Sequence, residues 1–152
     1  SRPTIGQILE EAKFKLLCGR DLLSNYVSKV IVGAMKPDDA IKYIVEDSLL
    51  ITPGDREDII NGALSCFRDS AKKKLKISGI VLSGGMLPDE GILKALTDAG
   101  VPVLISENDT YGVASSVHDL TVKIRPQDTG KIDAVVNLIK NNVDLDKILS
   151  CI

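Results

Sequence analysis

The stretch that decides the fold is residues 77–105, ISGIVLSGGMLPDEGILKALTDAGVPVLI. It begins with a short apolar run that ends at Ser83-Gly84-Gly85. Pro88-Asp89-Glu90 then has the residue types of a helix start, and Gly100 stands where a glycine commonly follows a helix end. A second apolar run, Val103–Ile105, comes directly afterwards. This order of strand, helix and strand predicts a βαβ unit with parallel strands.

The alternation of strand and helix continues on both sides of this stretch. Upstream, Leu49-Leu50-Ile51 predicts a buried strand and Asp55 the start of a long helix. Downstream, Asn108 or Asp109 predicts the cap of a further helix. Short strands that are apolar throughout are typical of a parallel sheet with helices on both faces. The sequence therefore predicts an α/β domain with three layers, α/β/α.

The two ends of the chain have less regular patterns. Thr4 and Gln7 form a capping-box pattern, which predicts a helix to about Glu11. Because the first strands precede the regular alternation, we expect a mixed, mainly parallel sheet of about five or six short strands with one antiparallel member. The other predicted elements are strands at Phe14–Cys18 and Val27–Val32, an edge strand at Thr121–Ile124, a helix that starts at Pro37, and closing helices at Asp128–Asn141 and Asp144–Leu149.

Length and composition indicate one domain with an aliphatic core. The 152 residues fit a single domain, with a predicted core at about 4–120 and a C-terminal helical extension at about 126–150. Apolar residues make up 44% of the chain but aromatic residues only 3%. The core must therefore consist mainly of isoleucine, leucine and valine, and the aromatic platforms that stack nucleic-acid bases are scarce.

Charge and cysteine spacing exclude several classes of function. The net charge of −2 is small and the signs are interspersed, so we expect no nucleic-acid or membrane partner. No apolar run has membrane-spanning length and no signal peptide is visible, which favours a cytoplasmic location. Cys18, Cys66 and Cys151 are far apart and His118 is the single histidine, so we expect reduced thiols, no metal site and no cofactor.

The candidate ligand-binding residues lie in three loops. They are Gly54-Asp55-Arg56, Ser83-Gly84-Gly85 and Asp109-Thr110-Tyr111, and each follows a predicted strand. If those strands are parallel, the three loops meet at the carboxyl edge of the sheet, where open α/β sheets bind ligands. A helix start with free N–H groups, a planar guanidinium and a glycine pair together suit a phosphate or carboxylate group.

A purely structural interpretation of the same loops stands beside the ligand hypothesis. Aspartates at these positions are ordinary helix caps, and glycines are ordinary residues of strand-to-helix turns. Arg56 can pair with Asp109 and so fasten two loops together. The sequence leaves both interpretations open.

No catalytic set can be named from the sequence. The known glycine-rich phosphate motifs are absent, and Ser83 does not lie in a nucleophile elbow. His118 has the position of a surface or capping residue near a helix end. The basic cluster Lys72-Lys73-Lys74 with Lys76 is explained by a helix C-terminus, whose dipole favours cations. We therefore predict that the chain is not an enzyme, and keep an independent hydrolase as the weakest hypothesis.

These loop motifs resemble the DRTGG domain family, which is named for its Asp-Arg and Thr-Gly-Gly residues. Asp55-Arg56 and Gly84-Gly85 match the name, and Ser83 stands where the family has threonine. The resemblance runs from about Thr4 to about His118. It also includes Val32-Gly33-Ala34-Met35, Val101-Pro102-Val103 and Asp109-Thr110-Tyr111.

The resemblance implies an accessory role. DRTGG domains lie in phosphotransacetylase-type proteins and beside CBS domains in regulated pyrophosphatases, and their fold is similar to the N-terminal domain of HPr kinase. It implies a regulatory or assembly domain that forms a homodimer and accompanies a neighbouring enzyme domain or subunit. Exposed apolar residues of Val27–Met35 or of the closing helices are the expected interface. The alternative is a sensor of a phosphate-bearing metabolite, such as a nucleotide, acyl-CoA or acyl phosphate, at the carboxyl edge of the sheet.

Overall fold

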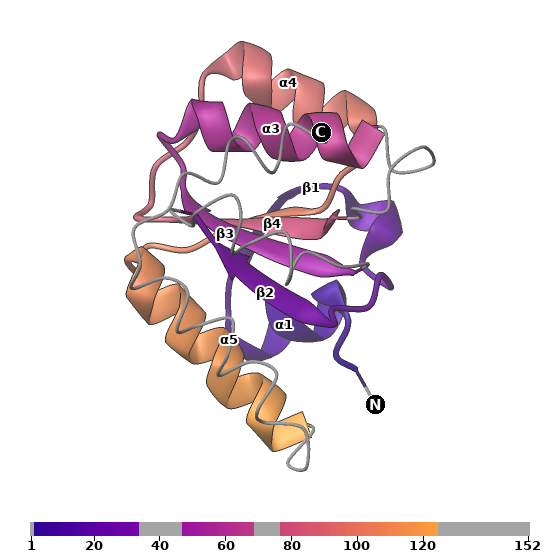
Figure 1. Cartoon of the computed structure of the whole chain (residues 1–152), viewed down its shortest axis with the longest axis vertical. Coiled ribbons are helices and arrows are strands. Elements are labelled where there is room, and N and C mark those ends of the chain that lie inside the picture. The colour runs from indigo at the N-terminus through magenta and orange to yellow at the C-terminus, as the bar shows by residue number, and fades with distance from the viewer. Residues whose placement is uncertain (1, 34–46, 69–76, 125–152) are drawn as a thin grey trace, which may run out of the picture.

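The computed structural model describes residues 2–33, 47–68 and 77–124 (Figure 1). In chain order the elements are α1 (Ile5–Glu11), β1 (Lys15–Cys18), the 3-10 turn η1 (Arg20–Leu22), β2 (Lys29–Val32), β3 (Ser48–Pro53), α3 (Glu57–Arg68), β4 (Ile77–Ser83), α4 (Glu90–Ala99), β5 (Val103–Ile105) and α5 (Thr110–Ile124).

The described strands form one mixed sheet in the order β1-β5-β4-β3-β2. Strands β2 to β5 are parallel to one another, and β1 is antiparallel to β5. The prediction of a mainly parallel sheet with one antiparallel member is confirmed. From β2 to β5 the spatial order follows the chain without a reversal, so the strand order supplies no switch-point crevice.

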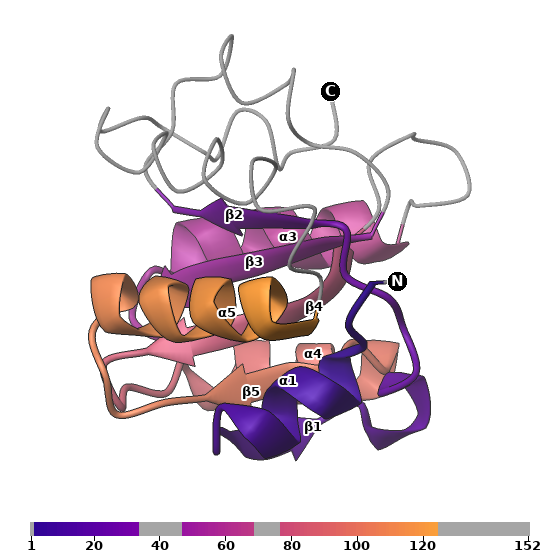
Figure 2. The same cartoon turned by 90° about the horizontal axis from the view of Figure 1, so that it is seen from below.

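Helices cover both faces of this sheet, as Figures 1 and 2 show. Helices α3 and α4 lie on one face and α1 and α5 on the other. Both faces of the sheet are apolar and need cover because successive side chains of each strand point to opposite faces. In β3, Leu50 joins the cluster beneath α3 and α4, while Leu49 and Ile51 join the cluster beneath α1 and α5. The predicted α/β fold class is confirmed.

Local signals at the helix ends are also confirmed. Thr4 and Gln7 form the expected capping box: the Thr4 hydroxyl accepts the Gln7 main-chain N–H at 3.1 Å, and the Gln7 side-chain amide oxygen Oε1 accepts the Thr4 main-chain N–H at 2.9 Å. The Asp89 carboxylate caps α4 by accepting the Gly91 N–H at 2.9 Å. Gly100 ends that helix in the left-handed region, with φ of 79°.

The predicted edge strand at Thr121–Ile124 is wrong, because these residues form the last turn of α5. Their β-branched composition resembles a strand, but Val117 and Thr121 are both buried one helical turn apart. The Thr121 hydroxyl donates to the Val117 carbonyl at 2.8 Å. As a consequence His118 lies inside α5 and not near its end. Similarly, the helix predicted to open at Asp55 begins at Glu57.

The expected interface on Val27–Met35 is wrong for its described apolar residues. The side chains of Val27, Val30, Ile31 and Val32 are all at least 97% buried within the chain. They face inward because β2 is covered by helices on both faces. The helix predicted from Pro37, the basic cluster Lys72–Lys76, the closing helices and Cys151 lie outside the described residues.

Two cysteines belong to the cluster beneath α3 and α4. Cys18 is free, and its Sγ donates to the Val101 carbonyl at 3.4 Å. Burial raises the pKa of its thiol. Cys66 is fully buried in the same cluster. None of the helices in the described ranges combines the length and apolar character that a membrane crossing requires.

Candidate functional site

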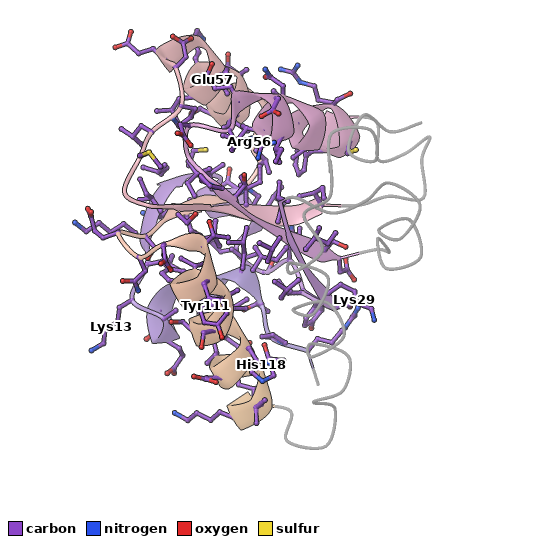
Figure 3. The ribbon with its side chains drawn as sticks, turned by 60° about the vertical axis from the view of Figure 1, so that its left-hand side comes forward. Lys13, Lys29, Arg56, Glu57, Tyr111 and His118 are labelled. Carbon is purple, nitrogen blue, oxygen red and sulfur yellow. The ribbon has the colours of Figure 1, made fainter. Side chains whose placement is uncertain are left out.

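The three candidate loops leave the same edge of the sheet. Because β3, β4 and β5 are parallel, with Pro53 opposite Ser83 and Leu82 opposite Ile105, their carboxyl ends lie together. This is the left-hand edge in Figure 1, which Figure 3 turns toward the viewer. The assumption on which the candidate site depended is therefore met.

Main-chain hydrogen bonds tie the loops to one another. The Gly54 N–H donates to the Ser83 carbonyl at 3.3 Å. The Gly84 N–H donates to the Asn108 carbonyl at 2.7 Å, and the Gly85 N–H to the Ser106 carbonyl at 2.8 Å. The amides of all three glycines are thus engaged between loops, and a ligand that used them would have to displace these bonds.

Gly54 is required by a close approach of two backbones. A Cβ atom at this position would lie 1.6 Å from the Met86 carbonyl oxygen, far inside the contact distance. The loop after β3 therefore packs directly against the loop after β4. Here the glycine serves packing, which the sequence pattern could not distinguish from a ligand-binding role.

The hydroxyl groups of the second and third loops meet below the surface. Ser83 Oγ and Thr110 Oγ1 are 2.7 Å apart, and Ser83 is only 1% exposed. Asp109 caps α5, because its carboxylate accepts the Gly112 N–H at 2.7 Å. Tyr111, the second residue of α5, is 67% exposed at the edge (Figure 3).

Arg56 pairs with Asp58 and not with Asp109, so the predicted bond between two loops does not form. The guanidinium makes a bidentate contact, with Nε 3.1 Å from Oδ1 and Nη2 3.0 Å from Oδ2 of Asp58. The Arg56 side chain keeps 40% of its surface exposed. A fork of this geometry can also bind a phosphate or carboxylate group, in competition with Asp58.

The edge also carries a cleft that the sequence did not reveal. It has a volume of about 310 Å³ and lies between residues 12–15, in the turn from α1 to β1, and residues 105–108, in the loop after β5. The antiparallel pair Lys15 and Ile105 brings these two segments together. Strand pairing between distant segments leaves no local signal, so only the structure could place Lys13 and Lys15 at this edge.

Comparison with known proteins gives a consistent result. The phosphate acetyltransferase of Nitratidesulfovibrio vulgaris is 29% identical over 146 residues, and that of Synechocystis is 32% identical over 148 residues. The matches cover 94% and 95% of this chain but only 20% and 21% of those enzymes. The phosphate acetyltransferase of Escherichia coli is 26% identical over 133 residues. The chain thus spans about a fifth of the length of these relatives.

A solved structure shares the fold. It contains the CBS and DRTGG domains of the regulatory region of a Clostridium perfringens pyrophosphatase, complexed with the activator diadenosine tetraphosphate. It aligns with 96% of this chain and 50% of that chain, with a TM-score of 0.52 and 16% identity. The family model of the DRTGG domain matches residues 7–120. This chain belongs to the DRTGG domain family.

Proposed function

We propose that this chain is a non-catalytic regulatory and assembly domain that accompanies an acyl-transferring enzyme of the phosphate acetyltransferase type. The family match carries this proposal: the DRTGG model covers residues 7–120, and the solved DRTGG domain that shares this fold belongs to the regulatory region of its enzyme. In the phosphate acetyltransferases nearly the whole chain corresponds to about a fifth of each enzyme, so most of each enzyme lies outside the matched part.

The burial and hydrogen bonding of the loop residue Ser83 support a structural or regulatory role. A serine nucleophile needs access to substrate and an adjacent base. Ser83 is almost completely buried, and its hydroxyl is hydrogen-bonded to Thr110. The family motif therefore holds loops together at this position and does not present a nucleophile.

A domain exchange tests the accessory role. In the Nitratidesulfovibrio vulgaris enzyme, deletion of the matched segment should change the oligomeric state or the KM for its substrates. Replacement of that segment by this chain should restore both, because the two segments share a fold. An enzyme whose assembly and kinetics are unchanged by the deletion would contradict the proposal. As a control for catalysis, this chain alone should transfer no acetyl group between CoA and phosphate.

The chain is further proposed to be one cytoplasmic domain, with a core at about 4–120 and a helical extension at about 126–150, that forms a homodimer. Multi-angle light scattering at tens of micromolar should give twice the mass of the chain. A strict monomer at that concentration would remove the homodimer from the proposal and leave the accessory role to be decided by the domain exchange.

A second candidate function is the sensing of a phosphate-bearing metabolite at the carboxyl edge. Two observations favour it: the edge carries the exposed guanidinium of Arg56, and the cleft described above opens there. The Clostridium perfringens regulatory region, whose fold this chain shares, binds a polyphosphate activator. The candidate residues are Gly54, Asp55, Arg56, Ser83, Gly84, Gly85, Asp109, Thr110 and Tyr111.

A thermal-shift screen with nucleotides, CoA esters and acyl phosphates tests this sensing role. A ligand at 100 times its dissociation constant stabilises the folded state by about 2.7 kcal/mol, which raises the melting temperature measurably. Arg56→Ala should reduce the shift without abolishing it, whereas Arg68→Ala at the other end of α3 should leave it unchanged. The absence of a shift with every compound would exclude the sensing role.

A further inference from the structure

The cleft at the β1–β5 side of the edge lies where the turn before β1 faces the loop after β5. Its walls are Ala12, Lys13, Phe14 and Lys15 on one side and Ile105, Ser106, Glu107 and Asn108 on the other. Its volume of about 310 Å³ is at the small end of the range for ligand pockets. A small metabolite would fit it better than a dinucleotide would.

Lys13 occupies a backbone position that normally belongs to glycine. Helix α1 ends in a Schellman motif, in which the Lys13 N–H donates to the Glu10 carbonyl and the Phe14 N–H to the Leu9 carbonyl. Lys13 itself has φ of 59°, in the left-handed region that disfavours residues with a Cβ atom. A lysine at such a position is an outlier that invites a functional explanation.

The two lysines of the cleft are not used by the described part of the fold. Lys13 and Lys15 are both exposed, and neither takes part in a side-chain hydrogen bond or an ion pair with another described residue. The single acidic residue of the lining, Glu107, has its carboxylate folded against Gly85, 2.5 Å from where a Cβ of that glycine would lie. Two lysines of the lining therefore have side chains without a hydrogen-bond or ion-pair partner among the described residues.

Apart from Glu107, the polar groups of the opposite wall are uncharged. Ser106 has a hydroxyl that accepts the Asn108 N–H at 3.1 Å, so its own proton is available to donate. The Asn108 carboxamide has two further N–H donors. Cations on one wall and neutral donors on the other are the groups that bind the oxygens of a phosphate or carboxylate.

We propose that this cleft is an anion-binding site, in which Lys13 and Lys15 bind the phosphate group of a small acidic metabolite. The site is distinct from Arg56 and the glycine loops, since none of the candidate loop residues lines it. The inference rests on the second proposed function, ligand binding at this edge, and specifies where the anionic group of the ligand lies.

The test is a titration of the full chain, followed by the amide shifts of residues 12–15 and 105–108 in two-dimensional NMR spectra. The probes are inorganic phosphate, acetyl phosphate and acetate, at constant ionic strength because exposed charges are screened by salt. Phosphate and acetyl phosphate should produce saturable shifts at these residues. Saturation by acetate with equal affinity would contradict a phosphate site.

Variants separate this site from the candidate loops. Lys13→Gly combined with Lys15→Gln removes both charges while the left-handed turn is kept, so the chain should fold and bind phosphate at least about tenfold more weakly. Lys29→Gln is the matched control: Figure 3 shows Lys29 at the opposite end of the sheet from Lys13, and its affinity should equal that of the wild type.

The outcomes distinguish the two proposals. A double variant that binds as tightly as the wild type, with binding lost in Arg56→Ala instead, would overturn the cleft assignment and leave ligand sensing intact. The absence of saturable shifts anywhere on the edge would overturn both. Loss of binding in the lysine variant alone, with shifts confined to the cleft, is the expected result.

Discussion

At the scale of single residues, Gly54 shows how a family motif can serve contact between loops. Its Cα lies so near the Met86 carbonyl oxygen that no side chain fits without a backbone shift. We expect Gly54→Ala to lower the free energy of unfolding by about 2–4 kcal/mol, the range for a severe steric conflict in a packed site. Urea denaturation measures this change.

Gly100→Ala is the control for Gly54, because it separates steric conflict from conformational strain. Gly100 has φ of 79°, but a Cβ there would meet nothing within 4 Å. Its substitution should therefore cost only the strain of a left-handed residue, about 1 kcal/mol. Equal losses in the two variants would show that the loops can separate, contrary to the packing described here.

The hydrogen bond between Ser83 and Thr110 is a second feature of single residues that can be measured. Ser83→Ala and Thr110→Val each remove one hydroxyl from a bond of 2.7 Å. Because removal of either partner loses the same bond, the double variant should be about as stable as each single one. A thermodynamic cycle should give a coupling of about 0.5–1.5 kcal/mol. Strictly additive losses would mean that the bond contributes nothing to stability.

At the scale of elements, the end of α1 gives a prediction with a definite sign. Lys13→Gly should stabilise the protein by about 0.5–1 kcal/mol. The substitution relieves left-handed strain of about 1–2 kcal/mol, and this gain exceeds the entropic cost of glycine's greater freedom in the unfolded chain. Ala12→Gly, one residue earlier, should destabilise it, because Ala12 has ordinary helical angles, with φ of −83°. Thermal unfolding of both variants checks the contrast, and a destabilising Lys13→Gly would contradict it.

Elements were predictable where the signal is local and unpredictable where it is not. Thr4, Asp89 and Gly100 mark helix ends through their own side chains or backbone, so the sequence located α1 and α4 closely. Thr121–Ile124 was predicted wrongly because β-branched residues favour strands, whereas the buried Thr121, which bonds back to Val117, continues α5. The cleft was missed for a different reason: it depends on the pairing of β1 with β5, which joins segments about ninety residues apart.

At the scale of the whole molecule, the three loops could be placed at one edge because parallel strands impose that arrangement. What the sequence could not show is that their amides and hydroxyls are already occupied by one another, since hydrogen bonds between loops depend on the final packing. The sequence therefore predicted that the candidate loops share one edge of the sheet, but not that their polar groups are hydrogen-bonded to one another.

The two described core clusters make a prediction about the extent of the folding unit. All of their buried residues lie between Ile5 and Leu120, and α5 contributes Val113, Val117 and Leu120 to one of them. A chain that ends after residue 124 should therefore unfold cooperatively. Its free energy of unfolding should be about 5–15 kcal/mol, the usual range for domains. A chain that ends after residue 111 loses this helix and the cover of one sheet face, and should not fold. Circular dichroism melting curves of the two truncations decide the matter, because loss of the cooperative transition in the longer one would place residues 125–152 within the core.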